Sequence, residues 1–421
     1  MIRIGIVGCG RILNAHLQGY KQLRARGIDN FRITALCARR DEDARMFVRR
    51  GDGPAPRPPV LDPATGDPLA APHTYLSDFQ DDVDPLIYTD YCDLIASDRI
   101  DAVNDFTTLA LHHQVGLTTL HAGKHLLTEK PLAVSVRAAQ RLVDVANERG
   151  LTLGVCEDAR QSPATRAAAW AVRTGLIGQV QVAVMGGLGG LWSPDRVVAD
   201  TPWRHEKRRG GGGGSIDIGV HQLHWMRYVV GEIAAVGAVA RTYEPVRYRR
   251  DGRGRIVEQV QADVDDTYLA TLIFDRGAIG QLWWSWGLHG EPLDIPGSPV
   301  LFGSEGSIRA SELVRDDGRS LPLQQEFEQS MTDAERAQFF PLGLRDPFAI
   351  QQLDWLRAIE RGTDPETSGA EGLRDLACAF AILESSTLGR QVTPREVLDH
   401  SVDAYQRDID AYYNLYVMNL R

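Results

Sequence analysis

The chain has 421 residues, too many for one ordinary domain, and it carries a formal net charge of −10 with a pI near 5.6. Hydrophobic residues make up 43% of it and charged residues 24%, the composition of a globular protein that dissolves in water. It has no long basic run and no apolar run near ~18 residues, so we expect neither a nucleic-acid partner nor a membrane span.

As far as residue 158, strand-like and helix-like patterns alternate. Strands are expected at residues 2–10, 31–39, 100–108, 125–129 and 151–158. Helical spacing is expected at residues 12–23, 41–50, 112–122 and 134–150. Residues 51–72 are rich in proline, glycine and aspartate and are expected to form an inserted surface loop. Alternating β and α segments predict a parallel, doubly wound sheet.

The turn after the first strand contains Gly8, Cys9 and Gly10, and a helix is expected to start just beyond Arg11 and Ile12. Glycines at this point let a backbone approach a pyrophosphate, and the helix N-terminus offers free N–H groups. Leu13 stands where the full G-x-G-x-x-G fingerprint has its third glycine. We therefore expect a dinucleotide site; a plain strand-to-helix turn is the alternative.

The second strand ends at Ala38, Arg39 and Arg40, with no acid before Asp41. An acid here would bind the ribose 2′-hydroxyl of NAD, whereas arginine suits the 2′-phosphate of NADP. The sequence therefore favours NADP without excluding NAD. The alternative is that these arginines are only solvated residues at a helix start.

Lys130 follows a short apolar strand and stands between Glu129 and Pro131. In an open α/β sheet, ligands bind at the carboxyl ends of the strands. A lysine can lose its proton when it is desolvated, whereas arginine cannot, and only four of the 46 basic residues in this chain are lysines. We therefore expect Lys130 to exchange a proton with a substrate; a surface lysine in a loop is the alternative.

After residue 158 the pattern changes to longer strand-like stretches at residues 179–187, 233–243, 265–274 and 277–288. Turns such as residues 275–277 predict an antiparallel sheet. Amphipathic helices with glycine stops are expected at residues 346–362 and 372–389. We therefore predict two domains, 1–158 and 159–421, the second an α+β domain. The tryptophans of residues 280–288 could form an exposed sheet face and a subunit contact, so we expect a homo-oligomer, a dimer or a tetramer.

Five glycines, residues 210–214, precede Ser215, Asp217, His221 and His224. We expect one helix with Ser215 as its N-cap, so that the three ionisable residues share a face. The glycines would let the chain lie close to a ligand and would leave this segment mobile. Histidine titrates near neutrality, so the stripe favours general acid–base catalysis. A metal site and a plain polar helix face are the alternatives.

The five cysteines are widely spaced and form no C-x-x-C pair, and no second Asp/His cluster accompanies the stripe. We therefore expect reduced thiols in a cytoplasmic protein and no metal.

These features together resemble the glucose–fructose oxidoreductase/inositol dehydrogenase family (Gfo/Idh/MocA), and the resemblance extends over almost the whole chain. It rests on residues 5–12, 128–133, 203–204, 212–224, 303–308 and 368–392. It implies an N-terminal Rossmann domain, a C-terminal domain with a large, mostly antiparallel sheet, and a nicotinamide cofactor. It also implies catalytic roles for Lys130, Asp217 and His221, and substrate contacts by Arg160, Trp203 and Arg204 together with those three residues and His224.

The chain departs from the family pattern at several points. Ala38 replaces the acid that many members use for NAD, and His224 stands where aspartate is common. Thr107, Thr108 and His112 lie in a stretch that in relatives reads Thr-Pro-Asn-x-x-His, and they are expected near the cofactor with Glu129 and Lys130.

The expected activity is hydride transfer between NAD(P) and a secondary hydroxyl of a sugar or cyclitol derivative. Two alternatives remain: a glycoside hydrolase or lyase that oxidises its substrate transiently with tightly held NAD, and a dinucleotide sensor without catalysis.

Overall fold

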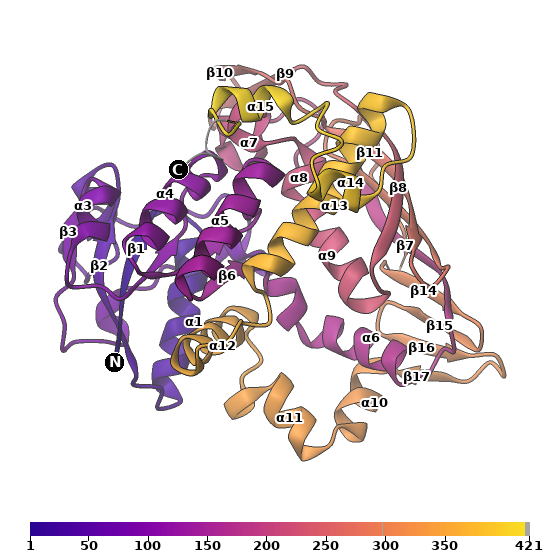
Figure 1. Cartoon of the computed structure of the whole chain (residues 1–421), viewed down its shortest axis with the longest axis horizontal. Coiled ribbons are helices and arrows are strands. Elements are labelled where there is room, and N and C mark those ends of the chain that lie inside the picture. Colours follow the sequence, from indigo (N-terminus) through magenta and orange to yellow (C-terminus); the bar gives the residue numbers. More distant parts are fainter. Residues whose placement is uncertain (297, 417–421) are drawn as a thin grey trace. The chain divides into compact units, whose positions relative to one another are not determined.

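In the computed structural model, which describes residues 1–296 and 298–416, the chain divides into two units (Figure 1). The first unit consists of Met1–Ala133, Ala139–Gln161 and Phe340–Gly372. The second consists of Val134–Ala138, Ser162–Phe339 and Leu373–Arg421. The crossing from Gln161 to Ser162 lies close to the predicted boundary at residue 158. The return of residues 340–372 to the first unit was not predicted.

The first unit is built on six parallel strands in the order β3-β2-β1-β4-β5-β6. The strands are β1 (Ile2–Val7), β2 (Phe31–Cys37), β3 (Leu86–Tyr88), β4 (Ala102–Asp105), β5 (His125–Glu129) and β6 (Leu153–Cys156). This is the strand order of the dinucleotide-binding Rossmann fold, so the predicted doubly wound sheet is confirmed. Strand β3 was missed because three residues carry no readable pattern.

Within the described residues, five helices of the first unit alternate with its strands, and a sixth comes from a later part of the chain. They are α1 (Leu13–Ala25), α2 (Asp41–Arg45), α3 (Tyr91–Ala96), α4 (Leu109–His121), α5 (Val136–Arg149), which starts in the second unit, and α12 (Pro347–Arg361). Short 3-10 helices lie at Pro63–Thr65, Pro68–Ala70, Leu76–Asp78, Asp158–Gln161 and Pro341–Gly343. Helix α2 is only half as long as expected, because the chain enters turns after Arg45.

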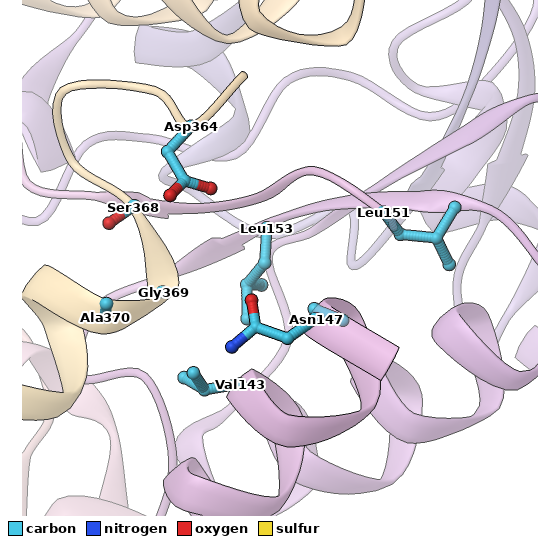
Figure 2. A pocket seen from close by; sticks show the side chains of 9 residues that line it. Val143, Asn147, Leu151, Leu153, Asp364, Ser368, Gly369 and Ala370 are labelled. Atoms are coloured by element: carbon cyan, nitrogen blue, oxygen red, sulfur yellow. The ribbon is translucent and has the colours of Figure 1, made fainter. Parts of the chain in front are cut away.

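Helix α12 packs beside α1, which fixes the late segment in the first unit (Figure 1). Gln352 Nε2 donates to the backbone oxygen of His16 at 2.9 Å, and Trp355 Nε1 donates to that of Leu126 at 3.1 Å. Ser368 forms a β-bridge with Gly154 of β6. A small hollow lies here, lined by the end of α5, by β6 and by residues 364–370 (Figure 2), and none of its lining residues was predicted as a site residue.

The second unit contains a nine-stranded sheet in the order β17-β16-β15-β14-β7-β12-β11-β8, with β13 paired to β7. Its strands are β7 (Val180–Leu188), β8 (Ile233–Arg241), β11 (Thr267–Phe274), β12 (Ile279–Ser285), β13 (Leu293–Asp294), β14 (Val300–Gly303), β15 (Gly306–Arg309), β16 (Glu312–Arg315) and β17 (Ser320–Pro322). All its pairs are antiparallel except β12 with β7. The predicted antiparallel sheet is confirmed. A separate hairpin joins β9 (Val246–Arg250) to β10 (Ile256–Gln261).

The second unit also contains nine helices within the described residues. They are α6 (Pro163–Arg173), α7 (Lys207–Gly210), α8 (Gly214–Asp217), α9 (Gly219–Val229), α10 (Leu323–Ser330), α11 (Asp333–Phe339), α13 (Gly369–Leu388, which starts in the first unit), α14 (Pro394–Leu398) and α15 (Arg407–Tyr412), with short 3-10 helices at Val198–Asp200 and Pro202–His205. The predicted glycine stops are confirmed: Gly362 and Gly389 follow α12 and α13 with φ of 63° and 66°.

The two faces of this sheet differ. Along β11, Tyr268, Ala270 and Leu272 are buried under helices, and the Tyr268 hydroxyl bonds to Gln222 of α9. The alternate residues Leu269 and Ile273 are exposed, as the twofold period of a strand requires. One face of the sheet is therefore packed and the other open.

The structure also bears on the predictions about membrane spans and cysteines. Within the described residues, no helix combines the length and the apolar character needed to cross a membrane. All five cysteines are free.

Candidate functional site

The turn between β1 and α1 requires glycine at its first position. Gly8 has φ of +104°, and a Cβ placed on it would lie 2.4 Å from the backbone oxygen of Phe106. A Cβ on Gly10 would meet no heavy atom within 4 Å. Gly8 therefore lets the end of β4 approach β1, and Gly10 leaves the space above the turn open.

Polar groups without partners surround this turn. No side chain caps the N-terminus of α1, although the N–H groups of Asn14 and Ala15 already donate to the backbone oxygens of Arg11 and Ile12 at 3.2 and 3.1 Å. Arg11 Nε and Asn14 Oδ1 are buried and have no hydrogen-bond partner among the described residues. Buried polar atoms are normally paired, so a donor and an acceptor remain for a bound molecule. These residues fit a dinucleotide.

The residues after β2 form a compact ionic cluster. Arg40 donates to Asp43 through Nε at 2.9 Å and Nη2 at 2.8 Å, and it also pairs with Glu42 at 3.1 Å. Arg39 is exposed, and Ala38 is held by a backbone hydrogen bond to Tyr88 at 3.1 Å. Of the two arginines predicted at the adenosine ribose, Arg40 is thus already bound to carboxylates of its own chain.

The loop after β4 is fastened to the turn after β5 by a buried histidine. His112 Nδ1 lies 2.8 Å from the backbone oxygen of Pro131, and Nε2 lies 3.3 Å from that of Thr107. The Thr107 N–H donates to Asp105 at 3.0 Å, and Thr108 is the N-cap residue of α4. His112 therefore joins the loops that carry Thr107 and Lys130.

Lys130 lies directly after β5, at the carboxyl edge of the sheet, as predicted. Its N–H donates to Glu129 Oε2 at 3.1 Å, and Glu129 Oε1 lies 2.8 Å from His16 Nε2. The His16 ring stacks on Phe106 with centroids 3.7 Å apart. Burial would raise the pKa of Glu129, but the hydrogen bond to His16 and the charge of Lys130 hold that pKa below its ordinary value. An ionised, doubly held carboxylate thus fixes the backbone of Lys130.

Cys156 extends this cluster, since ligand atoms of His16, Glu129 and Cys156 all lie within 4.8 Å of one another. Burial raises the pKa of the Cys156 thiol well above its ordinary value. A protonated thiol is a poor metal ligand, and the His16 ring is already engaged by Glu129. The cluster therefore supports Lys130 structurally.

The glycine run in the second unit does not have the predicted form. Residues 210–214 are buried, and a Cβ on Gly213 would lie 1.6 Å from the backbone oxygen of Asp265. The N–H groups of Gly213 and Ser215 and the Ser215 hydroxyl each donate to the Asp265 side chain at 2.8 Å. The glycines serve this close packing, so the prediction of a mobile segment is wrong.

The predicted single helix is also wrong. Ser215 lies inside α8 instead of capping it, and Ile218 separates α8 from α9 with φ of −104° and ψ of −40°. Asp217 ends the first helix and His221 lies in the first turn of the second, and both side chains are partly exposed.

Asp217 is paired with a residue that was also predicted for the site. Arg204 Nε donates to Asp217 Oδ2 at 2.9 Å, and the Arg204 guanidinium lies 4.4 Å from the centre of the Trp203 ring. The structure thus brings Trp203, Arg204 and Asp217 into one cluster in the second unit. Lys130 belongs to the first unit, and its joint action with Asp217 and His221 stays a prediction.

Two predicted substrate contacts are buried side chains. His224 has no exposed surface, and its Nδ1 lies 2.6 Å from Asp375 Oδ2; Asp375 also binds Arg227. Burial would raise the pKa of Asp375, but His224 and Arg227 together hold it below its ordinary value. Arg160 donates to the Glu366 backbone oxygen at 2.9 Å and to Glu371 at 3.3 Å.

Sequence reasoning missed three residues that shape these clusters: His16, Arg57 and Asp265. Arg57 lies in the inserted loop, where its Nη1 donates to the Cys9 backbone oxygen at 2.8 Å. Each forms a hydrogen bond with a residue between 48 and 113 positions away along the chain. No local sequence pattern reveals a contact at that separation. The one available signal was that His16 lies within the predicted first helix, close to the glycine turn.

Comparison with known proteins agrees with this geometry. Residues 2–157 match an oxidoreductase family with an NAD-binding Rossmann fold, the N-terminal domain of Gfo/Idh/MocA proteins, and residues 165–309 match the Gfo/Idh/MocA C-terminal domain. The two matches together span well over half of the chain.

Individual relatives carry the names of sugar and cyclitol enzymes. Levoglucosan dehydrogenase of Pseudarthrobacter phenanthrenivorans is 28% identical over 71% of this chain and 81% of its own length. Myo-inositol 2-dehydrogenase of Thermotoga maritima is 25% identical over 94% of this chain and 100% of its own length.

Solved structures share the fold. Levoglucosan dehydrogenase in complex with NADH and levoglucosan superposes with a TM-score of 0.69 at 21% identity, covering 93% of this chain and 98% of that one. An oxidoreductase domain protein from Kribbella flavida gives 0.70 at 22% identity with the same coverage. The chain belongs to the Gfo/Idh/MocA family of NAD-binding oxidoreductases.

Proposed function

We propose that this protein transfers a hydride between a nicotinamide dinucleotide and a secondary hydroxyl or ketone of a sugar or cyclitol derivative. The observation that carries the proposal lies within the first unit. The Gly8–Gly10 turn and Lys130 stand at the carboxyl ends of strands of one parallel sheet, where such sheets bind ligands. The names of the relatives, levoglucosan dehydrogenase and myo-inositol 2-dehydrogenase among them, support the substrate class.

The nicotinamide, when bound, accepts or gives the hydride at the substrate carbon. The glycine turn at the start of α1 and Arg11 would hold the pyrophosphate, and Thr107, Thr108 and His112, around the start of α4, would border the nicotinamide ribose. Lys130 polarises the substrate oxygen while Glu129 keeps its backbone in place.

The substrate hydroxyl proton passes to Lys130 or His221 as the hydride leaves in the oxidative direction. Asp217 anchors the substrate and supports His221, and Trp203 and Arg204 border the same cluster. We assign His224 and Arg160 to holding their own units in shape, since their side chains are buried against Asp375 and against Glu366 and Glu371.

The direct test is a panel of sugars and cyclitols with NAD and NADP in parallel, followed by the absorbance of the reduced nicotinamide. With the best substrate, Lys130→Met should lower turnover by about 100- to 10,000-fold, the range of general acid–base catalysis, and leave dinucleotide binding intact. Lys21→Met is the matched control, because Lys21 is a partly exposed lysine of the same unit. Near-normal turnover of Lys130→Met would remove Lys130 from the chemistry.

Two other outcomes would replace the proposal. Protein that purifies with a bound dinucleotide and converts a glycoside without net change in reduced nicotinamide would be a hydrolase or lyase. Protein that binds the dinucleotide and turns over no member of the panel would fit a sensor.

We also propose that the open face of the nine-stranded sheet joins two copies of the chain. Ile273, Ile279, Val182 and Phe302 lie opposite one another in register on four adjoining strands, and all four are exposed. Trp283 lies in register with exposed Leu269 on the same face, whereas Trp284 turns to the other face, against Gly214. A continuous apolar row of this kind is typical of a subunit contact.

Light scattering coupled to size-exclusion chromatography tests this contact. Ile279→Glu should convert an oligomer to a smaller species, because a charge would be buried in the contact. Ile256→Glu, which alters an exposed isoleucine of the β9–β10 hairpin, is the control. A wild-type monomer, or an Ile279→Glu protein with unchanged mass, would rule out this face.

A further inference from the structure

The inserted loop of residues 51–72 delivers one arginine to the dinucleotide turn. Arg57 Nη1 donates to the backbone oxygen of Cys9, the central residue of that turn, at 2.8 Å, and Arg57 Nη2 bonds to Asp43. The loop around it is ordered by two 3-10 turns, each capped by an aspartate: Asp62 accepts from Ala64 at 2.9 Å and Asp67 from Leu69 at 2.8 Å. Arg57 therefore has a defined position.

Asp43 gathers two guanidinium groups at this point. Its carboxylate accepts from Arg40 at 2.9 and 2.8 Å and is also bound by Arg57. The hydrogen bond from Arg40, together with that from Arg57, outweighs burial and lowers the pKa of Asp43. The carboxylate therefore stays ionised at neutral pH, and it holds both arginines together.

This cluster lies at the end of β2, next to the glycine turn. The Gly8 N–H donates to the backbone oxygen of Cys37, the last residue of β2, at 2.9 Å. In the Rossmann fold the ribose of the adenosine lies beside the end of the second strand, with its 2′ group toward the residues that follow it. A dinucleotide bound in this way would have its 2′ position near Arg57 and Arg40.

The charges at this edge favour a phosphate over a hydroxyl. Asp41 pairs with Arg45 at 2.7 Å and Glu42 with Arg40 at 3.1 Å, so both acids are engaged, as is Asp43. Arg39 is exposed and forms no ion pair in the described part of the chain. A guanidinium has five N–H donors, and the contacts to Cys9 and Asp43 engage only two of those of Arg57. Donors of Arg57 remain for a phosphate, whereas Asp41, Glu42 and Asp43 are each paired with an arginine. Asp90 and Asp93, whose charges also act on Cys37, follow β3, and Asp90 accepts from the Cys92 N–H at 2.8 Å.

We propose that Arg57, supplied by the inserted loop, is a specificity-determining residue that binds the 2′-phosphate of NADP(H) together with the exposed Arg39, while Arg40, bound to Asp43 and Glu42, helps to hold the cluster. The inference rests on the proposed function, since it names the cofactor of that same site. Asp43 positions Arg40 and Arg57 before the dinucleotide arrives, which lowers the cost of ordering them on binding. A planar guanidinium fork is well suited to phosphate oxygens.

Titration of the purified full-length protein with NADPH and with NADH, followed by nicotinamide fluorescence, tests the proposal without turnover. Wild-type protein should bind NADPH more tightly. Arg57→Gln should raise the Kd for NADPH by about 10- to 100-fold, the loss expected for a charge-assisted hydrogen bond, and change that for NADH by less than about threefold. Arg57→Lys keeps the charge and should recover part of the NADPH affinity.

Arg49→Gln is the matched control, because Arg49 is an exposed arginine of the same region that pairs with Asp52 and Asp84, and it should leave both Kd values unchanged. A measurement on the wild type alone provides a second check. Raising sodium chloride from about 0.05 to 0.5 M should raise the Kd for NADPH more than the Kd for NADH, since salt screens the charge of the extra phosphate.

Equal weakening of both dinucleotides by Arg57→Gln would show that Arg57 only shapes the glycine turn and would overturn the assignment. Tighter binding of NADH than NADPH by the wild type would overturn it as well and leave the proposed oxidoreductase activity standing. Wild-type protein that binds neither dinucleotide would overturn both.

Discussion

Asp265 holds the glycine run in place, and its removal should be among the most damaging single changes in the second unit. The Asp265→Ala variant would leave the N–H groups of Gly213 and Ser215 and the Ser215 hydroxyl without their acceptor in a buried site. A buried donor left unsatisfied costs about 1–3 kcal/mol, so the two amides alone should cost about 2–6 kcal/mol. Domains are typically stable by only about 5–15 kcal/mol, so this is a large share.

Urea unfolding followed by tryptophan fluorescence measures this loss, because seven of the eight tryptophans lie in the second unit. Glu258→Ala is the control: it removes an exposed carboxylate that pairs with Arg249 at 2.8 Å, and such a pair contributes at most about 1 kcal/mol. Turnover of Asp265→Ala should also fall, since α8 starts at Gly214 and ends at Asp217. A loss of unfolding free energy no larger than that of Glu258→Ala would refute the reasoning.

Two further predictions concern the glycine turn and a buried histidine. Gly8→Ala should lower the midpoint of thermal unfolding and abolish dinucleotide binding, because its Cβ would lie 2.4 Å from the Phe106 backbone oxygen at a φ of +104°. Gly10→Ala, whose Cβ would meet no heavy atom within 4 Å, should fold normally and weaken only dinucleotide binding. Equal thermal midpoints for the two variants would contradict this prediction. Burial, with the nearby charges of Arg247 and Arg204, lowers the pKa of His205 from 6.5 to about 3. Below about pH 6.5 this histidine is therefore protonated in the unfolded chain, whereas it stays neutral in the folded chain until the pH falls to about 3. The free energy of unfolding should therefore decrease as the pH falls below 6.5, by about 2 kcal/mol from this residue at pH 5. Urea unfolding at pH 7 and pH 5 should show a smaller decrease for His205→Gln than for the wild type. Equal decreases for the two proteins would contradict the prediction.

The elements that local sequence patterns encode could be predicted well. The apolar runs before Gly8 and Lys130 became β1 and β5, and the glycines after α12 and α13 end those helices. Each depends on neighbours within a few positions, so the pattern and the structure share one cause. The positions and chemistry of these residues predicted the turn and the lysine as parts of a site, and the resemblance to family motifs implied the same.

Features that depend on distant partners could not be predicted from local patterns. Residues 210–214 were expected to be mobile, but Asp265, about 50 positions later, binds the chain there. His224, whose substrate contact stays a prediction, lies against Asp375, 151 positions away, in the core of the second unit. The attachment of α12 to α1 depends on Gln352 and His16, 336 positions apart. In each case tertiary packing decided what a polar residue or a glycine does.

The central claim is that Lys130 and His221 serve one proton-transfer step of one hydride transfer. Turnover of the wild type, Lys130→Met, His221→Asn and the double variant, measured with the best substrate of the panel, tests it most directly. Residues that act as a unit are strongly non-additive, so the double variant should be little slower than the slower single variant. A double variant whose loss equals the product of two independent losses, or a single variant with near-normal turnover, would contradict the account.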